Sequence, residues 1–216
     1  MRAVLKKTAI IMIAIAVMFS FTLVPTESNA ATKVKKGTTY QCIKVKNKKT
    51  VYCTNYNHVF KVSLKKKKVV KKWRGYGYND MLKLKGNFLY FNGHGNGIGY
   101  SHIYRINLKT NKKKLLVKNV YDAYVVSGKR IYYAKVKYKD DGTMVTYNRV
   151  MWLNGTHKKK SKYKAKMTTK KTNSSKYYVW NDYDWESADT YDTPVNYYLH
   201  TPDGNILLET TDGPII

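Results

Sequence analysis

The sequence predicts an all-β fold, specifically an irregular or partial β-propeller of about four four-stranded antiparallel units. Two observations carry this prediction. Segments rich in β-branched and aromatic residues return at intervals of roughly 40 residues, the length of a four-stranded propeller blade. In addition, no segment follows the 3.6-residue periodicity of an amphipathic helix. Two packed antiparallel sheets would use the same strands and remain the alternative fold.

The first 30 residues predict a signal peptide. Basic residues precede an apolar run, and Ser28-Asn29-Ala30 forms a small-x-small cleavage site. The apolar run, residues 9–24, is shorter than the roughly 18–20 apolar residues that a membrane-spanning helix needs. We therefore expect a secreted protein, in a cell-wall-associated form or free, with no stable membrane span after cleavage.

An N-terminal strand or hairpin arm is expected over residues 31–50, followed by the repeat domain at 51–216. Cys42 and Cys53 flank two alternating strands around the turn at residues 46–49. With a four-residue loop the two cysteines lie opposite each other, with Cα atoms about 4.5 Å apart. An exported protein meets oxidising conditions, so we predict a structural disulfide, with two reduced thiols as the alternative.

The repeats define the units. HVFKVSL (58–64) returns as HIYRINL (102–108), and DMLKLKGNFLYF (80–91) returns as DAYVVSGKRIYY (122–133). A weaker third unit and a fourth unit follow, over residues 132–160 and 176–208. The strands expected in the second unit are residues 88–91, 102–108, 114–118 and 123–127, each bounded by turn residues.

The pattern of paired tyrosines, HIYRINL-K-T and KLL resembles bacterial secreted propeller-like repeats of unknown function, related to the YWTD propeller of the low-density-lipoprotein receptor. The resemblance covers residues 50–130 well and residues 131–216 loosely. It implies a fold and no activity. The first and fourth units lack the Asp and Gly that precede the first strand of the other two. We therefore expect an irregular or open ring, which a strand from residues 31–50 could complete.

Lysines gather at the turn between the second and third strand of successive units. The chain carries 41 Lys and Arg against 13 Asp and Glu. If the units stack, these turns form one surface, called here the lysine rim. Its members are Lys65, Lys66, Lys67, Lys68, Lys112, Lys113, Lys114, Lys158, Lys159 and Lys160. Such a surface favours an anionic polymer or glycan, with nucleic acid bound only non-specifically. The alternative is that these lysines only keep sheet edges soluble.

The opposite ends of the strands carry the long loops, residues 92–101, 134–145 and 180–194, where a glycan or peptide is expected to bind. The candidate residues on this loop face are His94, Trp180, Asp182, Asp184, Trp185 and Glu186. Residues 181–216 hold eight acidic groups and no Lys or Arg. We expect this acidic last unit to dock against basic neighbours, in preference to forming a dedicated site.

No sequence motif identifies a catalytic residue or a cofactor. The acidic loop at residues 182–192 lacks the Gly and Glu of an EF-hand, so it is not an EF-hand. Whether its carboxylates bind Ca²⁺ in another arrangement stays open. His58 and His102 occupy equivalent positions and are expected to be structural; no histidine has metal-ligand spacing. The favoured function is a non-catalytic binding module. The alternatives are a polysaccharide-active enzyme that uses carboxylates of the 182–192 loop and a structural or interaction scaffold.

Overall fold

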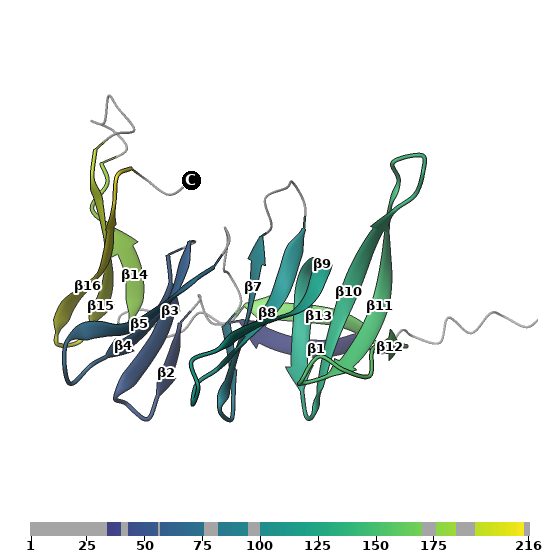
Figure 1. Cartoon of the computed structure of the whole chain (residues 1–216), viewed down its shortest axis with the longest axis horizontal. Coiled ribbons are helices and arrows are strands. Elements are labelled where there is room, and N and C mark those ends of the chain that lie inside the picture. The colour runs from purple at the N-terminus through teal and green to yellow at the C-terminus, as the bar shows by residue number, and fades with distance from the viewer. Residues whose placement is uncertain are drawn as a thin grey trace, which may run out of the picture. The chain divides into compact units, whose positions relative to one another are not determined.

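The fold is all-β, as the sequence predicts. The computed structural model describes residues 34–39, 43–55, 57–75, 82–94, 100–169, 176–184 and 193–213. The chain divides into two units, Met1–Lys33 and Val34–Ile216. The predicted signal peptide falls outside the described residues. Every regular element of the described residues is a β-strand (Figure 1).

The first sheet contains four antiparallel strands in sequence order. They are β2 (Lys44–Lys46), β3 (Thr50–Thr54), β4 (His58–Ser63) and β5 (Lys68–Arg74). The residues of β3 and β4 are rich in Val, Phe, Tyr and Thr, which fit a pleated surface buried on both sides. Strand β2 comes from the predicted N-terminal arm and supplies the fourth strand of this sheet.

The turn between β2 and β3 is one residue shorter than predicted. Lys46 pairs with Thr50, which leaves a three-residue loop of Asn47, Lys48 and Lys49. Asn47 and Lys48 both have positive φ values, near 50°, which close the chain more tightly than the expected four-residue turn. The predicted register of this hairpin is therefore wrong by one residue. Cys42 lies outside the described residues and Cys53 is buried, so the disulfide stays a prediction.

The large sheet contains seven strands in sequence order (Figure 1). They are β6 (Leu82–Lys85), β7 (Phe88–His94), β8 (Ser101–Asn107), β9 (Lys113–Ser127), β10 (Arg130–Tyr138), β11 (Met144–Trp152) and β12 (Lys159–Lys160). The predicted second and third units both lie in this sheet.

Strand β9 joins these two units, where the sequence analysis expected a turn. The predicted strands at residues 114–118 and 123–127 are one continuous strand of 15 residues. Its first half pairs with β8 and its second half with β10, and Val120 pairs with residues of both. Asn119 takes a positive φ of 56°, which asparagine tolerates well, and β9 bends back there. Leu153 shows the bend, because it hydrogen-bonds both Lys129, just after β9, and Arg105, which pairs with Lys114 near the start of β9. The two units therefore share a strand.

The predicted long loop at residues 134–145 is mostly strand. Alternation in Lys135-Val136-Lys137-Tyr138 continues β10, and β11 already begins at Met144. Only residues 139–143 remain as a loop, closed at Gly142 with a φ of 81°. The longer hairpin extends the sheet toward the loop face.

The C-terminal sheet contains three antiparallel strands: β14 (Tyr178–Asn181), β15 (Val195–Thr201) and β16 (Gly204–Thr211). Residues 202 and 203 form a tight turn, and Gly204 closes it with a φ of 110° that side chains rarely adopt. Strand β15 buries alternate residues, as expected of a strand with one face on a core.

A small two-stranded sheet has no counterpart in the predicted units. Strand β1 (Val34–Thr39) pairs in parallel with β13 (Lys164–Thr169). The two strands contact β9, and β13 also contacts β10. Because its partners are 130 residues apart in the chain, a repeat pattern gives no signal for this pairing.

Three hydrophobic cores show how the sheets stack. On one face of the first sheet, Val51, Cys53 and Phe60 pack with Tyr197 and Leu199 of the C-terminal sheet. On its other face, Tyr52 and Val59 pack with Leu89 and Phe91 of the large sheet. A third core, with Tyr90, Ile131 and Met151, lies within the large sheet. The first sheet is therefore covered on both faces, the blade-on-blade packing expected of propeller-like units.

Candidate functional site

The lysine rim residues lie in the β4–β5, β8–β9 and β11–β12 turns or at the start of the strand that follows each turn. Lys65–Lys67 form the turn between β4 and β5, and Lys68 begins β5. Lys112 precedes β9, and Lys158 precedes β12, whose two residues are Lys159 and Lys160. All ten except Lys113 are exposed.

Hydrogen bonds connect several of the turns at this end of the strands. Leu64 of the β4–β5 turn donates its backbone N–H to Lys49 of the β2–β3 turn, at 3.0 Å. Lys67 donates its ammonium to the carbonyl of Asp203 in the β15–β16 turn, at 3.4 Å. The backbone N–H of Leu108, after β8, donates to Asn87 of the β6–β7 turn, at 2.9 Å. The β4–β5 turn thus neighbours the equivalent β15–β16 turn of the C-terminal sheet, and adjacent turns contact each other within the first sheet and within the large sheet.

A basic groove lies between the turns of the first sheet and those of the large sheet. Its volume is about 320 Å³. It is lined by Lys46, Asn47, Lys49, Thr50, Tyr52, Lys61, Asn87, Leu108 and Lys109. Four of these residues are lysines and none is acidic, so the groove concentrates positive charge. These four lysines were not among the predicted site residues, because only their packing across two sheets brings them together.

Two lysines of the predicted rim donate hydrogen bonds to backbone carbonyls of the protein itself. Lys113 is half-buried, donates to the Arg74 carbonyl, and lies 5.2 Å above the Tyr104 ring. Burial, together with the charge of Arg74, lowers the pKa of Lys113 below that of an ordinary lysine. Lys158 donates to the Leu116 carbonyl at 3.0 Å. These two side chains hold the turns in place.

The predicted loop-face residues are only partly described. Trp185, Glu186 and the side chain of His94 lie outside the described residues. Trp180 of β14 stacks on Tyr198, with ring centroids 4.7 Å apart. Its indole N–H is buried and has no hydrogen-bond partner among the described residues.

The two described acids of this loop are exposed. Asp182 accepts two hydrogen bonds from Asn196, one from the backbone and one from the side chain, each 2.8 Å long. These bonds lower the pKa of Asp182, the side-chain bond contributing most. They tie the loop to the start of β15. Asp184 is also exposed. Within the described ranges, no group of three His, Cys, Asp or Glu side chains is placed to hold a metal ion.

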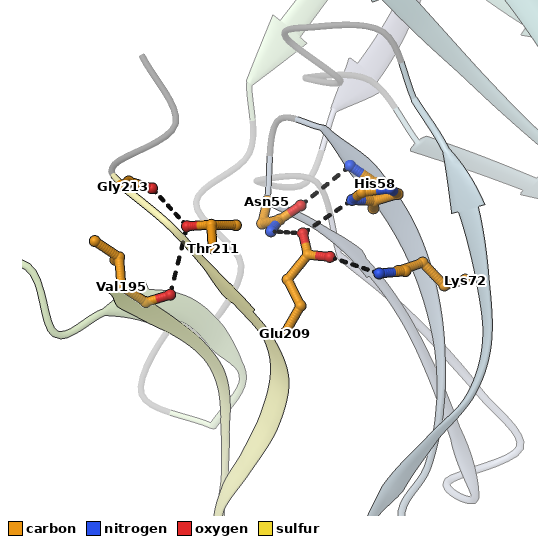
Figure 2. A network of polar contacts seen from close by, with 7 residues as sticks. All are labelled: Asn55, His58, Lys72, Val195, Glu209, Thr211 and Gly213. Carbon is orange, nitrogen blue, oxygen red and sulfur yellow. Dashed lines mark hydrogen bonds and ion pairs between the residues drawn. The ribbon is translucent and has the colours of Figure 1, made fainter. Parts of the chain in front are cut away.

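A polar cluster around Glu209 joins the C-terminal sheet to the first sheet (Figure 2). The carboxylate of Glu209 on β16 accepts hydrogen bonds from the side chains of Asn55, His58 and Lys72. The distances to His58 and Lys72 are both 2.9 Å. Only 8% of the Glu209 side chain is exposed. The expected docking of the acidic last unit on basic neighbours is confirmed for this residue, and His58 has the structural role predicted for it.

The environment of Glu209 favours its charged form. Burial by itself would raise the pKa of Glu209, but the hydrogen bonds from Asn55, Lys72 and His58 outweigh it, and the pKa lies below its ordinary value. A carboxylate held in this form by three donors is a poor proton donor at neutral pH. The cluster therefore suits docking of the two sheets better than acid catalysis.

We expect Glu209→Gln to destabilise the protein by about 1–2 kcal/mol at pH 7, because it removes charge-assisted hydrogen bonds at a buried position. A lowered carboxyl pKa stabilises the fold above the ordinary pKa of glutamate, and this contribution is lost as the pH falls through the lowered value. The difference between wild type and variant should therefore shrink in urea unfolding at pH 3.

The matched control is Asp203→Asn, which neutralises an exposed acid of the neighbouring turn and should change stability by less than about 0.5 kcal/mol. An equal loss in Glu209→Gln at pH 7 and pH 3 would contradict the role assigned to the carboxylate.

Comparisons with known proteins identify no family for this chain. No family model matches it, and no curated protein matches it. Among solved structures, hydrazine synthase of Kuenenia stuttgartiensis has a TM-score of 0.40 and 13% identity, over 51% of this chain and 38% of that one. The N-terminal domain of Nup159 has a TM-score of 0.36 and 14% identity, over 78% of this chain and 47% of that one. The chain thus spans less than half the length of either structure.

Proposed function

We propose that this protein is a non-catalytic binding module that associates with an anionic polymer through its lysine-bearing turns. The observation that carries this proposal is the basic groove, which joins lysines of the β2–β3 turn to Lys109 after β8. Lys65, Lys66 and Lys67 add exposed charge at the same end of the first sheet. A linear polyanion gains affinity on such a surface by releasing its counterions.

The proposed setting is outside the cell, where cell-wall and extracellular polymers often carry negative charge. It rests on the predicted signal peptide. The described part of the chain contains no helix suited to crossing a membrane. The resemblance of residues 50–130 to secreted propeller-like repeats is part of the same proposal.

Retention of the full chain on immobilised inorganic polyphosphate tests the proposal. We expect affinity to fall steeply with salt, and replacement of Lys65, Lys66 and Lys67 by Glu to reduce the salt slope by roughly one unit for each lost phosphate contact. The reduced slope separates contact at these turns from attraction by the whole molecule.

The matched control replaces Lys139, Lys164 and Lys166 by Glu, which changes net charge equally away from these turns. Equal weakening in both variants would indicate attraction by net charge alone. Unchanged retention in the turn variant would leave these lysines with a solubilising role. Either outcome would overturn the proposal.

A further inference from the structure

The large sheet carries a second basic furrow, separate from the groove between the turns. One cavity of about 550 Å³ is lined mainly by residues at the end of β10 and on β11. Another of about 560 Å³ lies beside it and is lined mainly by residues of β9. Both are lined by Lys135 and Arg149, so they adjoin, and together they are called here the furrow. Each volume is in the range of natural small-ligand pockets.

Strand register explains why tyrosines and cations alternate along the furrow. Lys135 lies directly opposite Tyr147, and Tyr133 lies opposite Arg149, across the β10–β11 ladder. Residues two apart on a strand share a face, so Lys135 and Lys137 project on the same side as Tyr147 and Arg149. The β10–β11 hairpin builds this arrangement because its paired strands continue to Tyr138 and Met144, well into the predicted loop at residues 134–145.

Three tyrosines line one end of the furrow: Tyr100 before β8, Tyr138 at the end of β10 and Tyr147 on β11. Tyr138 packs its ring edge-on against Tyr100, with centroids 5.4 Å apart. Tyr138 is 44% exposed and Tyr147 is 42% exposed. Exposed aromatic rings held on a rigid hairpin are suited to stacking on a flat apolar surface of a ligand. With Asn119, these residues also offer three hydroxyls and an amide to a hydrogen-bonding partner.

The furrow is strongly basic. Its lining includes Lys118, Lys135, Lys137, Arg149 and Lys158 and no acidic residue. None of these cations has a carboxylate partner among the residues that the structure describes. The charge of Arg149 also acts on the buried Tyr133, whose pKa burial raises and the guanidinium lowers. The positive charge is therefore left for a ligand to neutralise.

We propose that this furrow binds an acidic polysaccharide, with a sugar ring on Tyr147 and carboxylate, sulfate or phosphate groups on Lys135 and Arg149. Every aromatic residue of the lining carries a hydroxyl group, which matches the many hydroxyls of a sugar chain. The predicted export of the protein also places it where such chains occur. A single-stranded nucleic acid has the same charge and also stacks on aromatic rings, so it is the competing ligand class.

Calorimetric titration of the full chain with tetragalacturonate at about 0.15 M salt tests the proposal. We expect measurable affinity for this uronate and none for a neutral glucan tetramer. Tyr147→Ala should weaken binding about tenfold, whereas Tyr147→Phe, which keeps the ring, should weaken it less than about threefold. Joint replacement of Lys135 and Arg149 by Gln should also weaken binding at least about tenfold.

Tyr178→Ala removes a tyrosine of similar exposure on β14 and should leave affinity unchanged. Replacement of Lys65, Lys66 and Lys67 by Glu should change tetramer affinity less than about twofold. Because this variant alters the lysine-bearing turns and leaves the furrow intact, it separates a loss of binding in the furrow from a loss of the polymer binding proposed for the turns. Equal binding of neutral and acidic tetramers would overturn the proposal, and so would wild-type affinity in the furrow variants. Tighter binding of oligodeoxythymidylate than of the uronate would also overturn it, in favour of a single-stranded nucleic acid.

Discussion

Val120→Pro is expected to destabilise the protein by about 3 kcal/mol or more, and to weaken the strand pairing on both sides of β9. Val120 is 1% exposed and pairs with Ser101 of β8 and Lys135 of β10. Proline removes the backbone N–H of a central strand and fixes φ near −65°, away from extended geometry. Urea unfolding would measure the loss of stability.

The matched control is Val120→Ala, which truncates the same side chain but keeps the N–H group. It should cost less than the proline variant, about 1–3 kcal/mol. Amide hydrogen exchange in β8 and in β10 gives a second measurement. Because both strands depend on β9, protection should fall in both when proline is present. Loss of protection in only one of them would show that the two halves of the large sheet are independent.

Phe91→Ala is expected to destabilise the protein by about 3–5 kcal/mol, the range for truncating a fully buried phenylalanine. Phe91 has no exposed surface, and its ring stacks on Tyr104 with centroids 5.3 Å apart. It belongs to the core between the first sheet and the large sheet. The variant therefore tests whether packing between sheets, as well as pairing within them, stabilises the fold.

Leu207→Ala provides the comparison, because Leu207 is 49% exposed on β16 and its truncation should cost less than about 0.5 kcal/mol. Thermal unfolding of both variants, followed by circular dichroism, measures the two losses of stability. A Phe91→Ala protein as stable as Leu207→Ala would show that the two sheets do not rely on this packing.

Local sequence signals were sufficient for the strands and the turns. The repeated HVFKVSL and HIYRINL segments became β4 and β8, and the lysine runs mark turns as expected. Alternation of apolar and polar residues specifies which segments form strands, and Gly, Asn and Lys mark where the chain reverses. These properties depend on neighbouring residues, so a single sequence reveals them.

The errors arose where the outcome depends on distant partners. Residues 114–118 and 123–127 were expected to be separate strands, but they form one bent strand, β9, which pairs with β8 on one side of Asn119 and with β10 on the other. The contact of Glu209 with His58 links residues 151 positions apart, and the furrow needs the register of β10 with β11. No periodicity in the sequence encodes these distances, so the cavities could not be predicted.

Strand β9 has a consequence for the order in which the chain assembles during synthesis. Its first half meets its partner, β8, as soon as β9 has emerged, since β8 precedes it in the chain. Its second half must wait for β10, and until then it presents an unpaired edge that includes Tyr124, Val125 and Val126 to any neighbouring chain. A pause in translation just after Ser127 would prolong this vulnerable interval, and the nascent protein would then depend most on chaperones.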